Sequence, residues 1–369
     1  MPIRWNVPEH AAALHQLTTA LDPGGTRAGA VVLGPDGCGK STLARLAAED
    51  YAGRHPGTRV CWVIGTPAER DVPFGAFSHL VQVADIGKPA ALLRAARASL
   101  VDAEGELLLV VDDAHLLDIL SATLVYQLAL TGTARVIVTG RADCSPAPPR
   151  PITALWGDDL LARIDITASD ETSEAGRDVD AFVAGLPADV RATLDYLAVF
   201  EPLALVDLIR LTSADAVRQA EKLGAVETRA RGGREPDPVV YTAHPLFAER
   251  ARGTLGVEDA RARRSEVVGV LAARPCAHVG EQLRLAALAA DSDAPQPTTE
   301  VVDAAQQALR LGDLQLGERL ARHALDRSDE LAARLALAHA LGWQGRGRDA
   351  DAVLASVDPA DLSEPELMA

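Results

Sequence analysis

One stretch decides the fold of this chain: Gly34-Pro35-Asp36-Gly37-Cys38-Gly39-Lys40-Ser41-Thr42. It fits the pattern G-x-x-x-x-G-K-[ST], in which glycines let backbone N–H groups turn inward and bind an anion. Apolar residues 30–33 before it predict a buried strand, and residues 40–52 after it predict a helix whose positive N-terminal end faces the same anion. We expect Lys40 to reach the β and γ phosphates of a nucleotide, and Ser41 to offer its hydroxyl to Mg²⁺.

A glycine-rich turn that binds nothing is the alternative interpretation of this stretch. Against it, the chain has only three lysines, and one of them falls at the position that the pattern requires. The preceding strand and the following helix also fit the pattern. The phosphate-binding interpretation, with nucleotide contacts from all nine residues of the stretch, is therefore favoured.

Four more apolar segments predict strands, and helical segments separate most of them. The strand segments are residues 59–64, 107–111, 135–139 and 161–166, and the helical ones are residues 73–84, 88–102 and 116–131. Apolar strands that alternate with helices indicate a parallel sheet covered on both faces. The first 166 residues are thus predicted to form an α/β P-loop NTPase core.

Two carboxylates, Asp112 and Asp113, end the third strand abruptly. Ligands bind at this edge of a parallel sheet, so Asp112 is expected to hold Mg²⁺, mostly through water or Ser41. Asp113 is placed to orient or deprotonate an attacking water molecule. The alternative is that both residues only cap the next helix.

The fourth strand runs into Thr139, Gly140 and Arg141. This layout is that of P-loop ATPases with an added catalytic strand, which implies the sheet order 5-1-4-3-2. The end of the fourth strand would then face the γ-phosphate, and Arg141 would sense it. A solvated surface arginine is the alternative for Arg141.

After residue 166 the alternation stops. Residues 167–180 are polar and acidic, which predicts a linker. Residues 181–255 predict short helices followed by a hairpin, with strands at 226–229 and 239–242 and a turn at 231–234. Helices followed by such a hairpin are typical of a winged-helix-like module.

The last part of the chain predicts amphipathic helices, over residues 259–290 and 301–357. Residues 311–313 and 344–346 both mark turns, 33 residues apart, close to the period of tetratricopeptide-like helical hairpins. A chance periodicity in an Ala-rich chain is the alternative. Fewer than two repeats are visible, so these helices either pack on the preceding domain or belong to something longer.

Composition and charge exclude several classes of protein. The 369 residues are 48% hydrophobic, which excludes global disorder. Residues 1–150 carry 13 basic and 15 acidic side chains, whereas residues 151–369 carry 23 and 37, a net −14 that argues against nucleic-acid contacts. The four cysteines form no C-x-x-C pair, so neither a metal cage nor a disulfide framework is expected. Without a signal peptide or an 18-residue apolar run, the chain is predicted to be cytoplasmic.

The whole set of motifs resembles the large ATP-binding regulators of the LuxR family, which belong to the signal-transduction ATPases with numerous domains (STAND). The similar segments are residues 34–42, 71–81, 107–118 (LLLVVDDAHLLD) and 135–141 (RVIVTGR), and, more weakly, residues 197–206 and 242–246. The resemblance implies a switch in which ADP locks the ATPase and winged-helix modules together, and ATP with an inducer opens them for self-association. It also implies that His244 reaches the ADP phosphates. A histidine buried beside a proline turn is the alternative.

Three departures from the family pattern stand out. The Gly-Arg-Glu motif that helps to hold adenine is replaced at residues 6–10 by a stretch without arginine. Only residues 167–184 are available for the usual helical lid. No basic helix-turn-helix follows, so no direct DNA contact is expected.

The sequence therefore predicts four parts: an ATPase domain (1–166), a linker or vestigial lid (167–184), a winged-helix-like domain (185–256) and a helical-repeat region (257–369). The favoured function is an ATP/ADP-dependent, weakly hydrolysing signalling switch, a transcriptional regulator or its ATPase–sensor portion. An inducer or protein partner would bind the helical-repeat region. The alternative is an interaction scaffold without turnover, with or without nucleotide. A DNA motor is a third hypothesis, which the acidic second half opposes.

Overall fold

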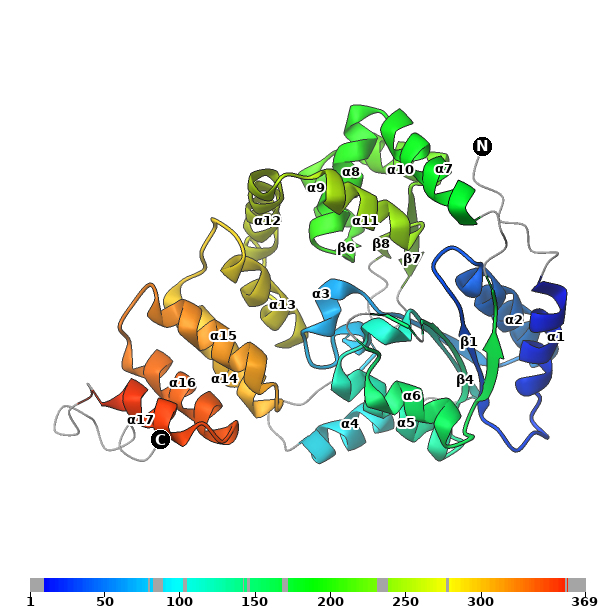
Figure 1. Ribbon diagram of the computed structural model, residues 1–369, viewed down its shortest axis with the longest axis horizontal. Helices are drawn as coiled ribbons and strands as arrows, with labels where there is room; N and C mark the ends of the chain where they lie inside the picture. Colours follow the sequence, from blue (N-terminus) through cyan, green and yellow to red (C-terminus); the bar gives the residue numbers. More distant parts are fainter. Residues whose placement is uncertain are drawn as a thin grey trace.

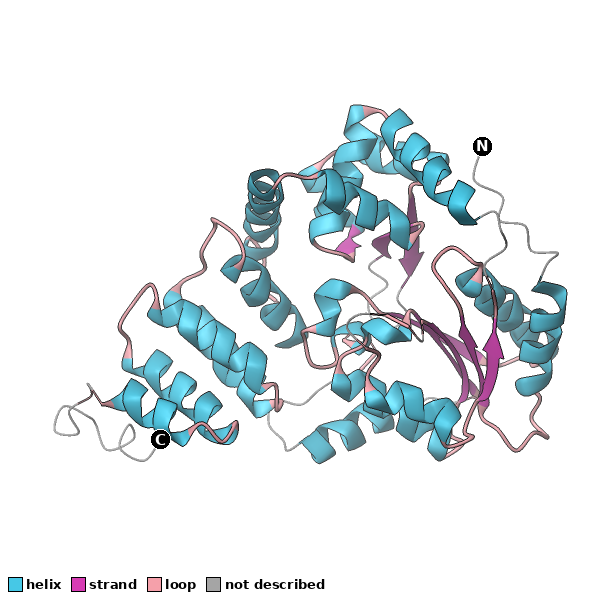
Figure 2. Ribbon diagram, in the orientation of Figure 1, coloured by secondary structure: helices cyan, strands magenta, loops and turns pink. Residues whose placement is uncertain are grey.

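The structure, a computed structural model, describes residues 10–78, 80–81, 89–101, 105–141, 143–144, 147–167, 172–230, 238–276, 279–355 and 357. A parallel five-stranded sheet is followed by a mixed module and then by helices (Figures 1 and 2). The mixed module lies against the sheet domain, and the last helices extend to one side (Figure 1). No helix within the described residues is both long and apolar enough to cross a lipid bilayer.

The parallel sheet has the predicted order. Its strands are β1 (Gly29–Leu33), β2 (Arg59–Ile64), β3 (Leu107–Asp112), β4 (Arg135–Gly140) and β5 (Ala162–Asp165). They pair in the order β2-β3-β4-β1-β5, which is 5-1-4-3-2 read from the other edge. The strand between β3 and β1 is β4, so the three strand ends that carry the predicted site are neighbours.

Apolar side chains cover both faces of this sheet. Val31, Val111 and Val138 face a core with α4 (Pro89–Val101), α5 (Ile119–Leu130) and α6 (Arg150–Gly157). Their chain neighbours Val32, Val110 and Ile137 face a second core with α1 (Ala11–Ala20) and α2 (Lys40–Arg54). Successive strand residues point to opposite faces, so a continuous apolar strand serves both cores.

The helix predicted over residues 73–84 is wrong in its described part. In its place lies a 3₁₀ turn, η2 (Gly75–Phe77), and a short helix, α3 (Pro67–Arg70), precedes it. Phe74 has a positive φ of 55°, which interrupts any helix at that residue. Phe74 and Phe77 are nevertheless buried, so the apolar spacing reflected a packed turn.

The second module combines helices with a small sheet. Its helices are α7 (Thr172–Gly185), α8 (Ala188–Val199), α9 (Leu205–Leu211), α10 (Ala214–Leu223) and α11 (Pro245–Thr254). β6 (Leu203–Ala204) and β7 (Val226–Ala230) flank β8 (Pro238–Thr242) in antiparallel pairing. The predicted helices and the two strands of the predicted hairpin are present, and the winged-helix assignment stays a prediction. The predicted turn at 231–234 lies outside the described residues.

Residues 167–184, predicted to be a linker or a vestigial lid, are not all loop, because α7 (Thr172–Gly185) begins within them. Val179 and Val183, four residues apart, are buried in the core of the second module. Two hydrophobic residues at helical spacing thus indicate the helix better than the overall polarity of this acidic segment does. The vestigial-lid alternative for this segment stays a prediction.

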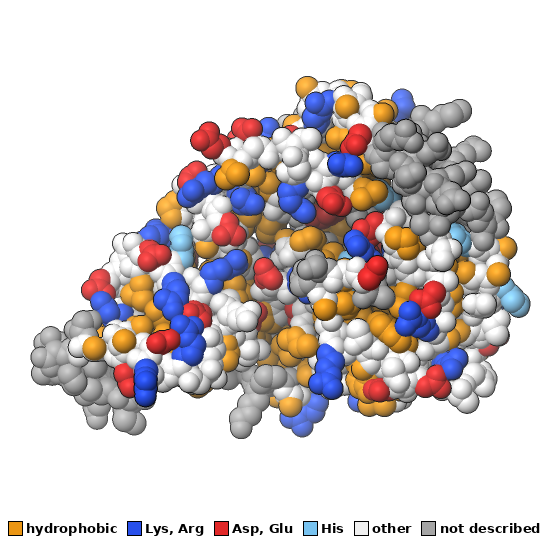
Figure 3. Space-filling model, viewed as in Figure 1, with side chains coloured by type: hydrophobic (Ala, Val, Ile, Leu, Met, Phe, Trp, Pro, Cys, Tyr) orange, Lys and Arg blue, Asp and Glu red, His pale blue; other side chains and the backbone are white. Residues whose placement is uncertain are grey.

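The remaining helices run α12 (Val257–Ala272), α13 (Val279–Ala290), α14 (Thr298–Arg310), α15 (Leu314–Leu325), α16 (Leu331–Trp343) and α17 (Gly347–Leu354). The two predicted turns lie between α14 and α15 and between α16 and α17. Gly312 and Gly345 take positive φ values of 84° and 79° there, a conformation that favours glycine. On the face seen in Figure 3, acidic and basic side chains are interspersed over these helices.

Candidate nucleotide-binding site

The predicted site residues meet at the carboxyl edge of the parallel sheet. The loop of residues 34–39 follows β1, and Gly34 N donates to the carbonyl of Gly140 at the end of β4. Gly34 lies so close to the end of β5 that a Cβ on it would be 2.6 Å from the carbonyl oxygen of Ile166. The loop is therefore anchored to the strands on both sides of β1.

Within the loop, two glycines take left-handed conformations, with φ of 77° at Gly37 and 91° at Gly39. The helix α2 starts directly afterwards at Lys40, as a phosphate cradle requires. The ammonium group of Lys40 is buried and donates to the carbonyl of Pro35 at 2.6 Å. Cys38 is buried behind the loop, where burial raises the pKa of its thiol, and Thr42 lines the pocket described below.

The residues predicted to hold Mg²⁺ are brought together. Ser41 Oγ donates to Asp112 Oδ1 at 2.9 Å, and the hydroxyl of Thr139 donates to the same oxygen. A hydroxyl and a carboxylate at this spacing are hard oxygen donors of the kind that Mg²⁺ takes, directly or through water. The residues present therefore fit a magnesium ion beside the phosphate loop.

Asp113 projects from a constrained backbone at the end of β3. Its φ is 51°, its N–H donates to Thr139 Oγ1 at 3.0 Å, and its carbonyl oxygen would lie 2.3 Å from a Cβ on Gly65. Burial, and secondarily the charge of Asp112, raise the pKa of Asp113 to about 8. The carboxyl is thus neutral at pH 7 while the site holds no cation.

His115 and Asp118, which follow on the chain, take different roles. His115 Nδ1 is buried 4.0 Å from Asp113 Oδ1 with no hydrogen-bond partner among the described residues, and burial lowers its pKa to about 4. Asp118 accepts from the backbone N–H groups of Leu120 and Ser121 and caps α5. Only His115 lies in the pocket.

Arg141 does lie at the phosphate loop. Its Nη1 is 2.6 Å from Asp36 Oδ2, and Asp36 Oδ1 is 3.9 Å from the Lys40 ammonium. A purely solvated surface arginine is thereby excluded. The pairing partner is a loop carboxylate, which the sequence did not indicate.

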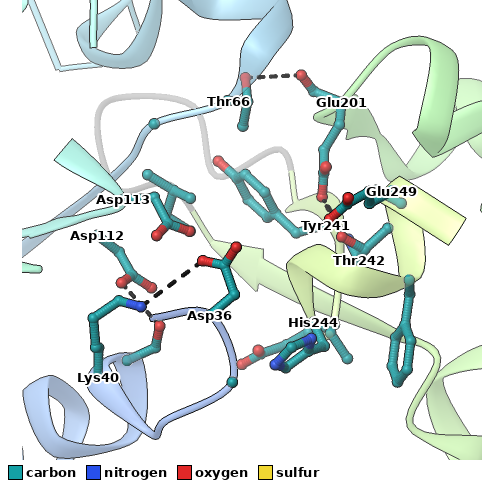
Figure 4. Close-up of a pocket in the computed structure, with 18 of the residues that line it drawn as sticks. Asp36, Lys40, Thr66, Asp112, Asp113, Glu201, Tyr241, Thr242, His244 and Glu249 are labelled. Atoms are coloured by element: carbon teal, nitrogen blue, oxygen red, sulfur yellow. Dashed lines mark hydrogen bonds and ion pairs between the residues drawn. The ribbon is translucent and has the colours of Figure 1, made fainter. Parts of the chain in front are cut away.

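The second module closes over this edge and leaves a pocket of about 640 Å³ between the two. Figure 4 shows Lys40, Asp36, Asp112 and Asp113 on one side of it and Thr242 and His244 on the other. His244 precedes α11 and its Nδ1 accepts from Leu246 N at 3.2 Å. Burial lowers the pKa of His244 to about 4, and the charges of Asp36 and Lys40 also act on it.

Sequence reasoning missed the acidic residue opposite the loop, Glu201. Its side chain accepts from the N–H and hydroxyl of Thr242, its backbone carbonyl accepts from Thr66 Oγ1, and burial raises its pKa to about 7. Nothing in its local sequence marks it, because its environment comes from two modules. Arg45 of α2, paired with Glu227 of β7 at 3.0 Å, was missed for the same reason.

No family model matches the chain, and no curated protein matches its sequence. Among solved structures it is similar to the STAND protein with a tetratricopeptide repeat sensor from Pyrococcus horikoshii, with a TM-score of 0.55 and 13% identity over 91% of this chain and 56% of that one. The chain thus spans about half the length of that protein. It also matches Drosophila ORC bound to AT-rich DNA and Cdc6 (TM-score 0.28, 13% identity, 66% of this chain and 94% of that one), a likeness too low to carry an argument.

At this identity the first likeness shows the fold. The chain shares with that protein a parallel-sheet core with a phosphate-loop motif, followed by a mixed module and a helical region. The narrower resemblance to LuxR-family regulators stays a prediction. Residues 6–9, which stand where the family has its Gly-Arg-Glu motif, lie outside the described residues.

Proposed function

We propose that this chain is a nucleotide-dependent switch that binds Mg-ATP and Mg-ADP at the phosphate loop and hydrolyses ATP slowly. One observation carries the proposal: the phosphate loop and His244 line the same pocket from two different modules. A ligand that contacts both sides stabilises the closed arrangement, and a ligand that contacts only the loop does not. The identity of the nucleotide would therefore set the relative position of the modules.

In this proposal each site residue has one task. The loop amides and Lys40 bind the phosphates, Ser41 and Asp112 hold Mg²⁺, Arg141 senses the terminal phosphate, and His244 contacts the phosphates from the second module. Bound Mg²⁺ supplies positive charge that neutralises the phosphate oxygens. Asp113 orients the attacking water or accepts its proton.

The wider role is proposed on the sequence resemblance and on the fold. A regulator of transcription, or its ATPase–sensor portion, would receive an inducer or protein partner at the helical-repeat region (257–369). It would self-associate when ATP, together with the inducer, opens the modules. Direct DNA contact is not part of this proposal, because the second part of the chain carries the acidic excess.

A calorimetric titration of Mg-ADP into the full chain tests nucleotide binding. Lys40→Ala should abolish the binding heat, since the buried ammonium is the cation nearest the phosphates. Lys222→Ala, on an exposed face of α10, is the matched control and should bind like the wild type. Equal affinity in Lys40→Ala and wild type would refute the phosphate-loop assignment.

The second candidate function is a scaffold that carries the loop without turnover. The observation that favours it is the pairing of Lys40 and Arg141 with acceptors inside the protein itself. A protein that purifies without nucleotide and shows no Mg²⁺-dependent thermal shift with ATP or ADP would support the scaffold over the switch.

A further inference from the structure

Asp36 places a carboxylate between the two cations of the phosphate site. It is the third residue of the loop, and its two oxygens lie 2.6 Å from Arg141 Nη1 and 3.9 Å from Lys40 Nζ. Figure 4 shows its side chain reaching toward Lys40 and the pocket. A loop position that needs only a backbone amide for phosphate binding thus also carries a negative charge into the site.

The two cations that Asp36 contacts are those that the proposed function assigns to the phosphates. Lys40 also donates to the carbonyl of Pro35, so internal acceptors engage both cations. Arg141 Nε, in contrast, is buried with no hydrogen-bond partner among the described residues. Arg141 therefore keeps a donor that a phosphate oxygen would satisfy.

Ion pairs already occupy two further cations of the pocket. Six acidic side chains line it against four lysines and arginines: Asp36, Asp112, Asp113, Glu201, Glu227 and Glu249, against Lys40, Arg45, Arg229 and Arg252. Arg45 and Arg229 both pair with Glu227. A third phosphate group would therefore have to draw on Arg141, which Asp36 already contacts.

We infer that Asp36 is a specificity-determining residue whose side chain makes this site prefer a nucleoside diphosphate to a triphosphate. The inference rests on the proposed nucleotide binding. The Asp36 carboxylate takes the place of a terminal phosphate at Arg141, and a triphosphate must displace it or lie beside it. Two anions competing for one cation at hydrogen-bond distance in a half-buried site oppose each other strongly. The diphosphate leaves the Asp36–Arg141 pair intact.

The test compares two nucleotides in one variant of the full chain. Mg-ADP and the Mg²⁺ complex of the imido-bridged, non-hydrolysable ATP analogue are titrated calorimetrically into wild type and Asp36→Asn. We expect the analogue to bind Asp36→Asn about tenfold more tightly than wild type, and ADP to change by less than about threefold. Asp159→Asn, in the exposed pair with Arg27 of the same domain, is the control and should leave both affinities unchanged.

A double-mutant cycle ties the effect to Arg141. In an Arg141→Gln background, Asp36→Asn should change the ratio of analogue to ADP affinity by less than about twofold. The reason is that Asp36 and the third phosphate compete for the Arg141 guanidinium, which this background lacks. Asp36→Ser is a second neutral replacement, included in case Asn itself disturbs the loop. It should change the ratio of analogue to ADP affinity in the same direction as Asp36→Asn.

Each other outcome overturns the inference in a distinguishable way. An unchanged affinity ratio in both neutral variants, with ADP still bound, removes Asp36 from selectivity and leaves the proposed function standing. If the neutral variants bound both nucleotides more weakly than wild type by the same factor, Asp36 would be a cation ligand instead. Absence of binding to all variants and to wild type would overturn the proposed function together with the inference.

Discussion

Arg284 of α13 lies with its Nη1 3.5 Å from Glu69 Oε1, and so joins the helical region to the sheet domain. Glu69 is only 1% exposed and also accepts from Thr66 Oγ1 at 3.0 Å. The guanidinium of Arg284 donates in addition to the carbonyl of Pro202 and lies over the ring of Phe200, 4.4 Å from its centroid. One arginine thus contacts both of the other modules beside the pocket.

Replacing Arg284 by Met should destabilise this junction by about 3 kcal/mol, because it removes a cation from beside the buried Glu69 carboxylate. Unfolding in urea measures the loss, and X-ray scattering reports whether the helical region moves away. Arg27→Met, in an exposed pair, is the control and should cost less than about 1 kcal/mol. Adding Glu69→Gln to Arg284→Met should recover part of the loss; strictly additive losses would contradict the pairing.

Asp113→Asn should change how stability depends on pH. The pKa of Asp113 is about 8 in the folded protein and 3.8 as its ordinary value, so the folded state holds more protons between these limits. Wild-type stability therefore falls as pH rises through this window, and Asp113→Asn removes that contribution. Thermal melts are recorded from pH 5 to 9 without Mg²⁺. The melting temperature of the variant minus that of wild type should increase with pH up to about pH 8.

The same Asp113 variant should keep ADP binding and lose ATP hydrolysis, which a phosphate-release assay measures. Asp159→Asn, exposed on the same domain, is the control in both experiments. A melting-temperature difference that stays constant with pH would mean that Asp113 is ionised in the nucleotide-free protein, and retained turnover would remove it from the proton-accepting role.

His244→Asn should weaken ADP binding several-fold while leaving stability nearly unchanged, because Asn keeps a side-chain acceptor for Leu246 N at the start of α11. His244→Ala should weaken binding equally and also cost about 1 kcal/mol of stability through the lost cap. Since the pKa of His244 is about 4 in the nucleotide-free protein, contact with phosphate should draw a proton onto it. Titration in buffers of different ionisation enthalpy should show less proton uptake for His244→Asn; identical uptake would place His244 away from the phosphates.

Gly317→Ala should destabilise the helical region, because an added Cβ would lie 2.5 Å from Leu309 Cδ2 across the α14–α15 interface. Gly269→Ala, in α12 with open space at its Cβ, should raise stability slightly through helix propensity. Chemical denaturation monitored by circular dichroism distinguishes the two. Equal effects would mean that α14 and α15 do not pack this closely.

The sheet domain and its phosphate loop could be predicted from the local sequence, because the strands are uniformly apolar and the motif has fixed spacing. The turns at Gly312 and Gly345 were equally readable, because a positive φ favours glycine. Three contacts could not be predicted from the sequence, because each joins residues from separate segments that only the tertiary fold brings together. They are Glu69–Arg284, Asp36–Arg141 and Glu201–Thr66. The apolar residues of α7 were present in the sequence, but the surrounding charge hid their helical spacing.

A crystal structure of the full chain with Mg-ADP tests the central claim most directly, since it shows whether the nucleotide lies between the two modules. The account predicts the β-phosphate within hydrogen-bond distance of Lys40 Nζ, Mg²⁺ beside Ser41 and Asp112, and His244 in contact with a phosphate oxygen from the second module. ADP held by the loop with His244 turned away, or no ADP at the loop at saturating concentration, would contradict it.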